Sequence, residues 1–240
     1  MLHDGQRKTL MVRKEKALLV SVIVPIFNEE KTLREIIDRV RALDLPKEII
    51  VVNDCYQDSS GNILEQMTDI RLLTHPVNRG KGAAIRTGLA HVKGDVVVVQ
   101  DGDLEYNPND LPILLRPILE GRADVVYGSR FLGRMQGMRM QNVLGNKVLT
   151  GLTNVLFGAR ITDMETCYKM IRTTVLEGIK LRANRFDFEP EITAKILKKK
   201  VRFLEVPISY QGRTHLDGKK IGWKDGIQAI YSLVKYRLID

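Results

Sequence analysis

The sequence has few cysteines, few aromatic residues and no long hydrophobic run. Its two cysteines, Cys55 and Cys167, are too few for a disulfide framework and lack the spacing of a metal cluster. Aromatic residues make up 6% of the chain, and no expected helix has a dense basic face, which argues against nucleic acid as a partner. The longest apolar stretch, residues 17–27, is interrupted by Ser21 and Pro25, and it falls short of the roughly 20 residues that a membrane span needs.

The first residues also lack the hydrophobic region of a signal peptide, since polar residues such as His3, Asp4 and Arg7 precede any apolar run. We therefore expect a cytoplasmic protein. The formal net charge is +9, which predicts attraction to an anionic bilayer or to phosphorylated small molecules. Charge alone does not choose between these partners.

The 240 residues are enough for one domain with a substantial core. Residues 1–16 are predicted to form a basic, mobile tail, residues 17–210 the main domain, and residues 211–240 a basic loop with an amphipathic helix. Apolar strands alternate with amphipathic helices, which predicts an α/β fold with a mostly parallel sheet. We expect strands at 18–25, 48–52, 70–74, 95–100, 123–127, 167–171 and 201–208.

Helices are expected between these strands. Their predicted positions are 32–43, 62–67, 81–92, 109–118, 141–157, 189–199 and 223–238. Asn109 is a candidate cap for the fourth of them, and Pro112 is tolerated in its first turn.

The most informative segment is a run of four valines that ends in three carboxylates: Asp101, Asp103 and Glu105. Valine crowds a helix but fills a pleated sheet, so residues 96–99 are expected to be a buried parallel strand. Ligands of open α/β sheets collect at the carboxyl ends of strands, and Mg²⁺ prefers carboxylate and phosphate oxygens. The segment therefore predicts a site for a divalent metal that carries a diphosphate, with an acidic turn that merely ends a strand as the alternative.

Further polar residues follow the other strands. Glu29 can receive ribose hydroxyls, or it can complement the dipole of the next helix. Asp54 can accept a hydrogen bond from a base or a ribose, or it can cap a helix. Lys81 lies between Gly80 and Gly82, where it can neutralise phosphate, although this turn is neither a complete Walker loop nor a dinucleotide fingerprint. A solvated basic loop is the alternative for Lys81.

Taken together, these segments resemble a known family. They are SVIVPIFNEE (21–30), IVVND (50–54), NRGKGAA (78–84), QDGDLE (100–105), GSR (128–130), TDMET (162–166) and FDFEPE (186–191). As an ordered set they resemble the family 2 glycosyltransferases of GT-A fold, in the branch that includes dolichol-phosphate mannose and glucose synthases. The resemblance covers nearly everything after the basic tail.

The resemblance implies roles for individual residues. Nucleotide-sugar binding is implied for Pro25, Phe27, Glu29, Asp54, Lys81, Asp101 and Gly102. Asp103 is implied as the main ligand of Mg²⁺ or Mn²⁺, with Glu105 where relatives also reach the metal. Relatives usually have Asp-Asp-Gly-Ser after the second strand, whereas this chain has Asn-Asp-Cys-Tyr at 53–56, so the preferred base is in doubt.

Two further groups complete the predicted site. Arg130 and Asp163 are assigned to catalysis, with Asp163 as a general base or an acceptor-orienting group, or else as a simple turn carboxylate. Arg213, Lys219 and Lys220 resemble a loop that closes over the diphosphate or recruits a lipid phosphate, with a solvated basic loop as the alternative.

The chain is therefore expected to be a metal-dependent, inverting hexosyltransferase with a UDP- or GDP-sugar as donor and polyprenyl phosphate as acceptor. Peripheral membrane contact is expected near residues 223–238. A soluble enzyme that acts on a saccharide or small-molecule hydroxyl is the main alternative, and a non-catalytic nucleotide-sugar sensor is a remoter one. Haloacid-dehalogenase-type phosphatases also have an Asp-x-Asp pair after a strand, but near the N-terminus and without the Leu104-Glu105 that follows here.

Overall fold

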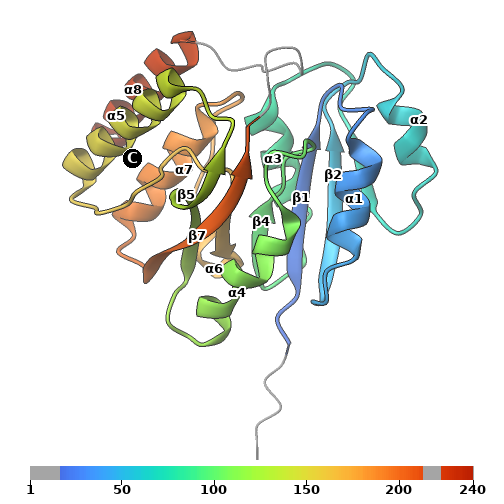
Figure 1. The fold of residues 1–240 in the computed structure, drawn as a ribbon, viewed down its shortest axis with the longest axis horizontal. Coiled ribbons are helices and arrows are strands. Elements are labelled where there is room, and N and C mark those ends of the chain that lie inside the picture. The colour runs from blue at the N-terminus through green and yellow to red at the C-terminus, as the bar shows by residue number, and fades with distance from the viewer. Residues whose placement is uncertain (1–16, 213–222, 240) are drawn as a thin grey trace, which may run out of the picture.

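The computed structural model describes residues 17–212 and 223–239, in which one sheet is flanked by helices (Figure 1). The sheet has seven strands in the order β3-β2-β1-β4-β6-β5-β7. The strands are β1 (Val20–Ile26), β2 (Lys47–Asn53), β3 (Arg71–Thr74), β4 (Val96–Val99), β5 (Val125–Gln136), β6 (Lys169–Arg172) and β7 (Phe203–Gln211).

Within this sheet only β6 runs against its neighbours. It pairs antiparallel with β4 and β5, whereas β1 with β2, β1 with β4, β2 with β3, and β5 with β7 are parallel. The predicted α/β fold with a mostly parallel sheet is therefore confirmed. One consequence is that β1, β2, β4 and β5 all end at the same edge of the sheet, the upper edge in Figure 1.

Helices cover both faces of the sheet. In Figure 1, α1 and α4 lie in front of the sheet, and α3 and α7 lie behind it. The helices are α1 (Leu33–Arg41), α2 (Ser60–Glu65), α3 (Lys81–Leu89), the 3₁₀ turn η1 (Pro108–Asp110), α4 (Leu111–Leu119), α5 (Met140–Phe157), α6 (Thr173–Leu176), α7 (Phe188–Lys198) and α8 (Trp223–Leu238).

The core follows from the apolar strands. All residues of β4 are buried, as are those of β1 apart from the half-buried Pro25, because helices pack on both faces of the sheet. A smaller cluster of Leu149, Ile161, Met164, Ala229 and Leu233 joins α5 to α8 at the left of Figure 1. The C-terminal helix α8 thus packs on α5 and α7.

Every predicted strand and helix is present, with ends that shift by a few residues. The largest difference is β5, which continues to Gln136 because it resumes pairing with β7 after a register shift between Ser129 and Arg134. The short helix α6 was not predicted. The prediction that Asn109 caps a helix is wrong: the side chain of Asn107 accepts a hydrogen bond from the Asn109 N–H at 3.1 Å.

Two predicted segments, the basic tail 1–16 and the basic residues of 213–222, lie outside the described residues. Within residues 17–212 and 223–239, no helix combines the length and the apolar character that a bilayer crossing requires.

The irregular part of β5 makes a stability prediction. A Cβ atom at Gly133 would lie 1.9 Å from the carbonyl oxygen of Ile208 on β7, so β5 and β7 must separate in Gly133→Ala. We expect this variant to lose about 2 kcal/mol of unfolding free energy. The control is Gly145→Ala on the outer side of α5, where nothing lies within 4 Å and where alanine should add about 0.5–1 kcal/mol. Urea denaturation measures both, and equal midpoints for the two variants would contradict the structure.

Candidate active site

A cavity of about 310 Å³ lies at the edge where β1, β2 and β4 end. Its walls come from the ends of these strands, from the start of α3 and from the turn before α7. The predicted site residues that line it are Pro25, Phe27, Glu29, Asp54, Lys81, Asp101, Gly102, Asp103 and Glu105. Residues that are far apart in the sequence are therefore brought together around one space, which has the size of an ordinary small-molecule site.

The acidic turn after β4 is held by contacts to three other elements. Asp101 forms an ion pair with Lys81 at 2.7 Å. The carbonyl of Gly102 accepts a hydrogen bond from the Thr32 hydroxyl at 2.9 Å, next to α1. One oxygen of Asp103 accepts the backbone N–H of Glu105 at 2.9 Å. These contacts fix the direction in which the carboxylates leave the strand.

Lys81 connects the acidic turn to α7. Its Nζ atom lies 2.7 Å from Asp101 and 3.3 Å from Glu189, and all three side chains are largely buried. Burial alone would lower the pKa of Lys81, but the charges of Asp101 and Glu189 outweigh it and raise the pKa well above its ordinary value. The lysine is therefore a permanent cation at the cavity wall.

A second group of buried carboxylates lies behind Lys81. One oxygen of Glu165 and one of Glu189 are buried without a hydrogen-bond partner in the described part of the chain. Burial, together with the charge of Glu189, raises the pKa of Glu165 to about 7. The charge of the buried Lys169 opposes this shift, so both Lys81 and Lys169 lie near the carboxylates on this side of the site.

Asp54 organises the loop before α3. Its carboxylate accepts hydrogen bonds from the backbone N–H groups of Arg79 (2.9 Å) and Gly80 (2.7 Å) and faces Nδ1 of His75 at 2.7 Å. Gly80 has a φ of +93°, a backbone conformation that favours glycine. Asp54 therefore holds the turn that places Lys81 in the cavity.

Backbone N–H groups around the start of α3 are hydrogen bonded to other parts of the chain. The N–H groups of Arg79 and Gly80 point to Asp54, and that of Ala83 donates to the carbonyl of Asn184 at 3.0 Å. These three backbone N–H groups are therefore engaged within the protein. Asn78, Gly80 and Lys81 of this turn line the cavity.

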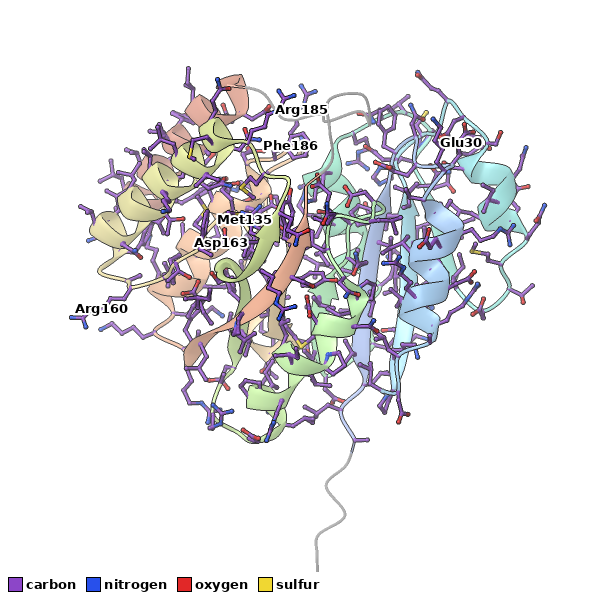
Figure 2. The ribbon with its side chains drawn as sticks, viewed as in Figure 1. Glu30, Met135, Arg160, Asp163, Arg185 and Phe186 are labelled. Carbon is purple, nitrogen blue, oxygen red and sulfur yellow. The ribbon has the colours of Figure 1, made fainter. Side chains whose placement is uncertain are left out.

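Arg185 and Phe186 line the cavity, although only Phe186 lies in a segment that carried the resemblance and neither was predicted as a site residue. They belong to the turn that packs on the start of α3 through Asn184, and Figure 2 shows both at the upper edge of the sheet. A basic and an aromatic residue just before α7 were the available signal. Only the three-dimensional packing of that turn on α3 brings them to the cavity.

Arg130 and Asp163 form a buried ion pair beside the cavity. Two guanidinium N–H groups of Arg130 donate to the two oxygens of Asp163, each at 2.7 Å, and the Arg130 backbone N–H donates at 3.0 Å. Asp163 is 0% exposed and Arg130 is 6% exposed. Both oxygens of Asp163 are therefore engaged by one arginine.

Tyr210 on β7 joins this pair to the acidic turn. Its hydroxyl donates to Glu105 at 2.8 Å, and the guanidinium carbon of Arg130 lies 5.3 Å from the centre of its ring. Burial, with the charge of Glu105, raises the pKa of Tyr210, so the hydroxyl remains a hydrogen-bond donor. The predicted catalytic and metal-binding residues are thus in one connected network.

The predicted metal ligands Asp103 and Glu105 are two carboxylates on one turn that line the cavity. Among the described residues, no group of three or more His, Cys, Asp or Glu side chains is placed to hold a metal ion. Arg213 and Lys219 lie outside the described residues, as does Lys220.

The fold and the carboxylates at its strand ends define the GT-A class of sugar-nucleotide transferases. Residues 21–180 match Glycosyl transferase family 2, and the chain belongs to this family. The predicted family resemblance is therefore confirmed.

Curated relatives agree with this assignment. The chain is 30% identical to the dolichol-phosphate mannosyltransferase of Pyrococcus furiosus over 90% of its length and 64% of the relative. It is 27% identical to the low-salt glycan biosynthesis hexosyltransferase Agl6 of Haloferax volcanii, over 92% of this chain and 55% of the relative. It is also 27% identical to an undecaprenyl-phosphate 4-deoxy-4-formamido-L-arabinose transferase of Pseudomonas fluorescens, over 83% of this chain and 59% of the relative. The chain thus spans between half and two thirds of the length of these relatives.

Solved structures share the fold. A glucosyl-3-phosphoglycerate synthase from Mycobacterium tuberculosis in complex with UDP superposes with a TM-score of 0.73 at 21% identity, over 93% of this chain and 81% of the other. The same enzyme in complex with Mn²⁺, UDP and phosphoglyceric acid gives a TM-score of 0.72. At this identity the similarity establishes the fold alone.

The buried ion pair makes a stability prediction. Asp163→Asn leaves the Arg130 charge buried without a counter-charge, which should cost about 3–5 kcal/mol of unfolding free energy. The control is Glu35→Gln, which removes the carboxylate of the exposed pair between Glu35 and Arg39 and should cost under about 0.5 kcal/mol. Urea denaturation compares the two, and a loss in Asp163→Asn as small as in the control would show that the pair is not buried as described.

Proposed function

We propose that this protein is a metal-dependent, inverting hexosyltransferase that transfers a sugar from a UDP- or GDP-sugar to polyprenyl phosphate. The observation that carries the proposal is the single cavity in which the carboxylates after β4 and the cation of Lys81 face the same space. Carboxylates, a fixed cation and a wall of strand-end residues are what a metal-bound diphosphate requires.

In this proposal the nucleoside lies against the ends of β1 and β2. Pro25 and Phe27 contribute apolar surface, and Glu29 accepts ribose hydroxyls. Asp54 acts mainly by holding the loop of Arg79 and Gly80, because its carboxylate already binds both backbone N–H groups. Arg185 and Phe186 are added to the nucleotide-binding residues because they line the same cavity.

The residues present fit a divalent metal in a specific way. Mg²⁺ in proteins is commonly held by one or two carboxylates while substrate phosphates and water complete its shell, so a three-residue cage is not needed. Asp103 is the proposed principal ligand and Glu105 a second one, since both line the cavity on the same turn. When bound, Mg²⁺ or Mn²⁺ supplies positive charge that stabilises the diphosphate leaving group.

The chain's own residues support the same step. Lys81 stays protonated between Asp101 and Glu189, so it adds a fixed cation near the leaving diphosphate without any rearrangement during the reaction. Asp101 holds Lys81 in place. An acceptor that attacks the anomeric carbon from the side opposite the diphosphate inverts the configuration of the sugar.

The Arg130–Asp163 pair favours a phosphate acceptor over a hydroxyl acceptor. A hydroxyl needs a base to take its proton, but both oxygens of Asp163 are engaged by Arg130 and the residue is fully buried. A phosphate monoester is already an anion and needs little help of this kind. We therefore assign Asp163 to the positioning of Arg130, and Arg130 to the binding of the acceptor phosphate.

The relatives support the same acceptor class, because two of those named above are a dolichol-phosphate mannosyltransferase and an undecaprenyl-phosphate sugar transferase. The UDP and Mn²⁺ complexes of the structural neighbour support a uridine nucleotide and a divalent metal as the first ligands to test.

The proposal predicts that transfer depends on Asp103 and on a divalent metal. Purified protein is offered a panel of UDP- and GDP-sugars with polyprenyl phosphate, with Mn²⁺, with Mg²⁺ or with chelator. We expect one donor to be used, chelator to abolish transfer, and Asp103→Ala to lower the rate by about 100-fold or more. Asp44→Ala, at an exposed carboxylate after α1, is the matched control and should transfer at the wild-type rate.

Each other outcome refutes a definite part of the proposal. Absence of both transfer and nucleotide-sugar hydrolysis under all conditions would refute the proposal that the protein is an enzyme. The non-catalytic nucleotide-sugar sensor would then be the favoured alternative. Transfer only to saccharide or small-molecule hydroxyls would refute the lipid acceptor and the role given to Asp163. Full activity in the presence of chelator would refute the proposed dependence on a divalent metal.

A further inference from the structure

Asp54 lies on the side of the cavity away from the acidic turn. The sheet order β2-β1-β4 separates the end of β2, which precedes Asp54, from the end of β4, which precedes Asp103. Both residues line the cavity. In the proposed function the diphosphate lies beside Asp103, so a nucleoside that extends across β1 brings its base to Asp54. The inference that follows rests on the proposed function in this respect.

The Asp54 carboxylate has little capacity left for a ligand. A carboxylate oxygen accepts hydrogen bonds at about two positions. Oδ1 accepts from Nδ1 of His75 at 2.7 Å and from the backbone N–H of Arg79 at 2.9 Å, so both of its positions are used. Oδ2 accepts from the backbone N–H of Gly80 at 2.7 Å. Among the described residues no second donor binds Oδ2, which therefore keeps one position for a ligand.

His75 is held in place on both sides of its ring. Nδ1 donates its proton to Asp54, because an ionised carboxylate only accepts hydrogen bonds. Nε2 is hydrogen bonded to the Thr87 hydroxyl on α3 at 2.9 Å, and the backbone N–H of His75 donates to the carbonyl of Asn53 at 2.8 Å. His75 is 5% exposed and Asp54 is 2% exposed. The imidazole therefore occupies Oδ1 permanently.

Nucleobases differ in the hydrogen-bond donors that they present to such a group. Uracil presents one ring N–H between two carbonyl groups. Guanine presents a ring N–H beside an exocyclic amino group, and a carboxylate pairs with these two donors through both of its oxygens. Adenine and cytosine have no ring N–H on the corresponding edge. The single position on Oδ2 therefore suits uracil, whereas guanine would keep a donor unpaired beside His75.

We propose that His75 is a specificity-determining residue, which makes the site select uracil over guanine by occupying Oδ1 of Asp54. The ring N–H of uracil donates to the remaining position on Oδ2. Arg185 lies beside Gly80, since a Cβ atom on that glycine would be 3.2 Å from Cγ of the arginine, and it lines the same cavity. Its guanidinium group supplies N–H donors for a uracil carbonyl. The donor is thereby narrowed from a UDP- or GDP-sugar to a UDP-sugar.

The test measures nucleotide binding rather than turnover. Isothermal titration calorimetry gives the dissociation constants of UDP and GDP for the full chain with Mg²⁺. We expect wild type to bind UDP at least about 10-fold more tightly than GDP, because an unpaired donor in a buried site weakens binding by about this factor or more. His75→Ala frees Oδ1 for a second donor, so the preference for UDP should fall by about 10-fold.

Two kinds of variant control this measurement. In His75→Asn the side-chain Nδ2 stands where Nδ1 of histidine stood, so it can still donate to Oδ1, and the preference for UDP should be retained. His91, just after α3, is half-buried, and its ring binds the carbonyl of Thr87 at 2.9 Å. His91→Ala should therefore keep the wild-type preference. A loss of folded protein lowers the amount that binds both nucleotides but leaves the ratio of the two dissociation constants unchanged.

The outcomes separate this inference from the proposed function. GDP bound by wild type as tightly as UDP, or more tightly, would refute the inference and leave the proposed transferase in place. A ratio in His75→Ala equal to that of wild type would refute the role of His75. If neither nucleotide binds, both the inference and the proposed function are wrong. A preference that falls in His75→Ala and is retained in His75→Asn and His91→Ala supports the inference.

Discussion

The site depends on one interaction, the contact of the buried Lys81 ammonium with Asp101 and Glu189. Removing charged groups from water costs several kcal/mol per ion, so carboxylates gathered at a largely buried sheet edge need a cation among them. Lys81 supplies it from the start of α3, Asp101 lies after β4, and Glu189 lies on α7. This contact therefore joins α3, β4 and α7 at the wall of the cavity.

A second charged contact extends the same arrangement toward the side proposed for the acceptor. Arg130 leaves β5 and is held by Asp163, while Tyr210 connects it to Glu105 on the acidic turn. The proposed donor side and the proposed acceptor side of the site are thus linked through side chains. The long segment between Arg130 and Asp163 contains α5, so this helix is attached to the site at both ends.

Much of this arrangement is predictable from the sequence because it depends on local patterns. The valine run identifies β4 as buried, and the carboxyl ends of parallel strands must meet, so Asp54, Asp101 and Asp103 are expected at one edge. What the pattern cannot supply is the partner of each group. That Asp54 binds Arg79 and Gly80, that Asp163 is enclosed by Arg130, and that Arg185 reaches the cavity all depend on contacts between distant segments. The exposure of Leu144, Val148 and Val155 on α5 likewise shows no signal in the sequence, because apolar residues at helical spacing usually face a core.

The central claim is that Asp103 and its neighbours hold a metal-bound diphosphate in the cavity beside Lys81. Anomalous diffraction from crystals grown with Mn²⁺ and UDP tests it most directly. The account predicts a manganese peak within coordination distance of an Asp103 oxygen and of the diphosphate of UDP. A peak that is absent from this cavity, or UDP bound elsewhere on the molecule, would contradict it.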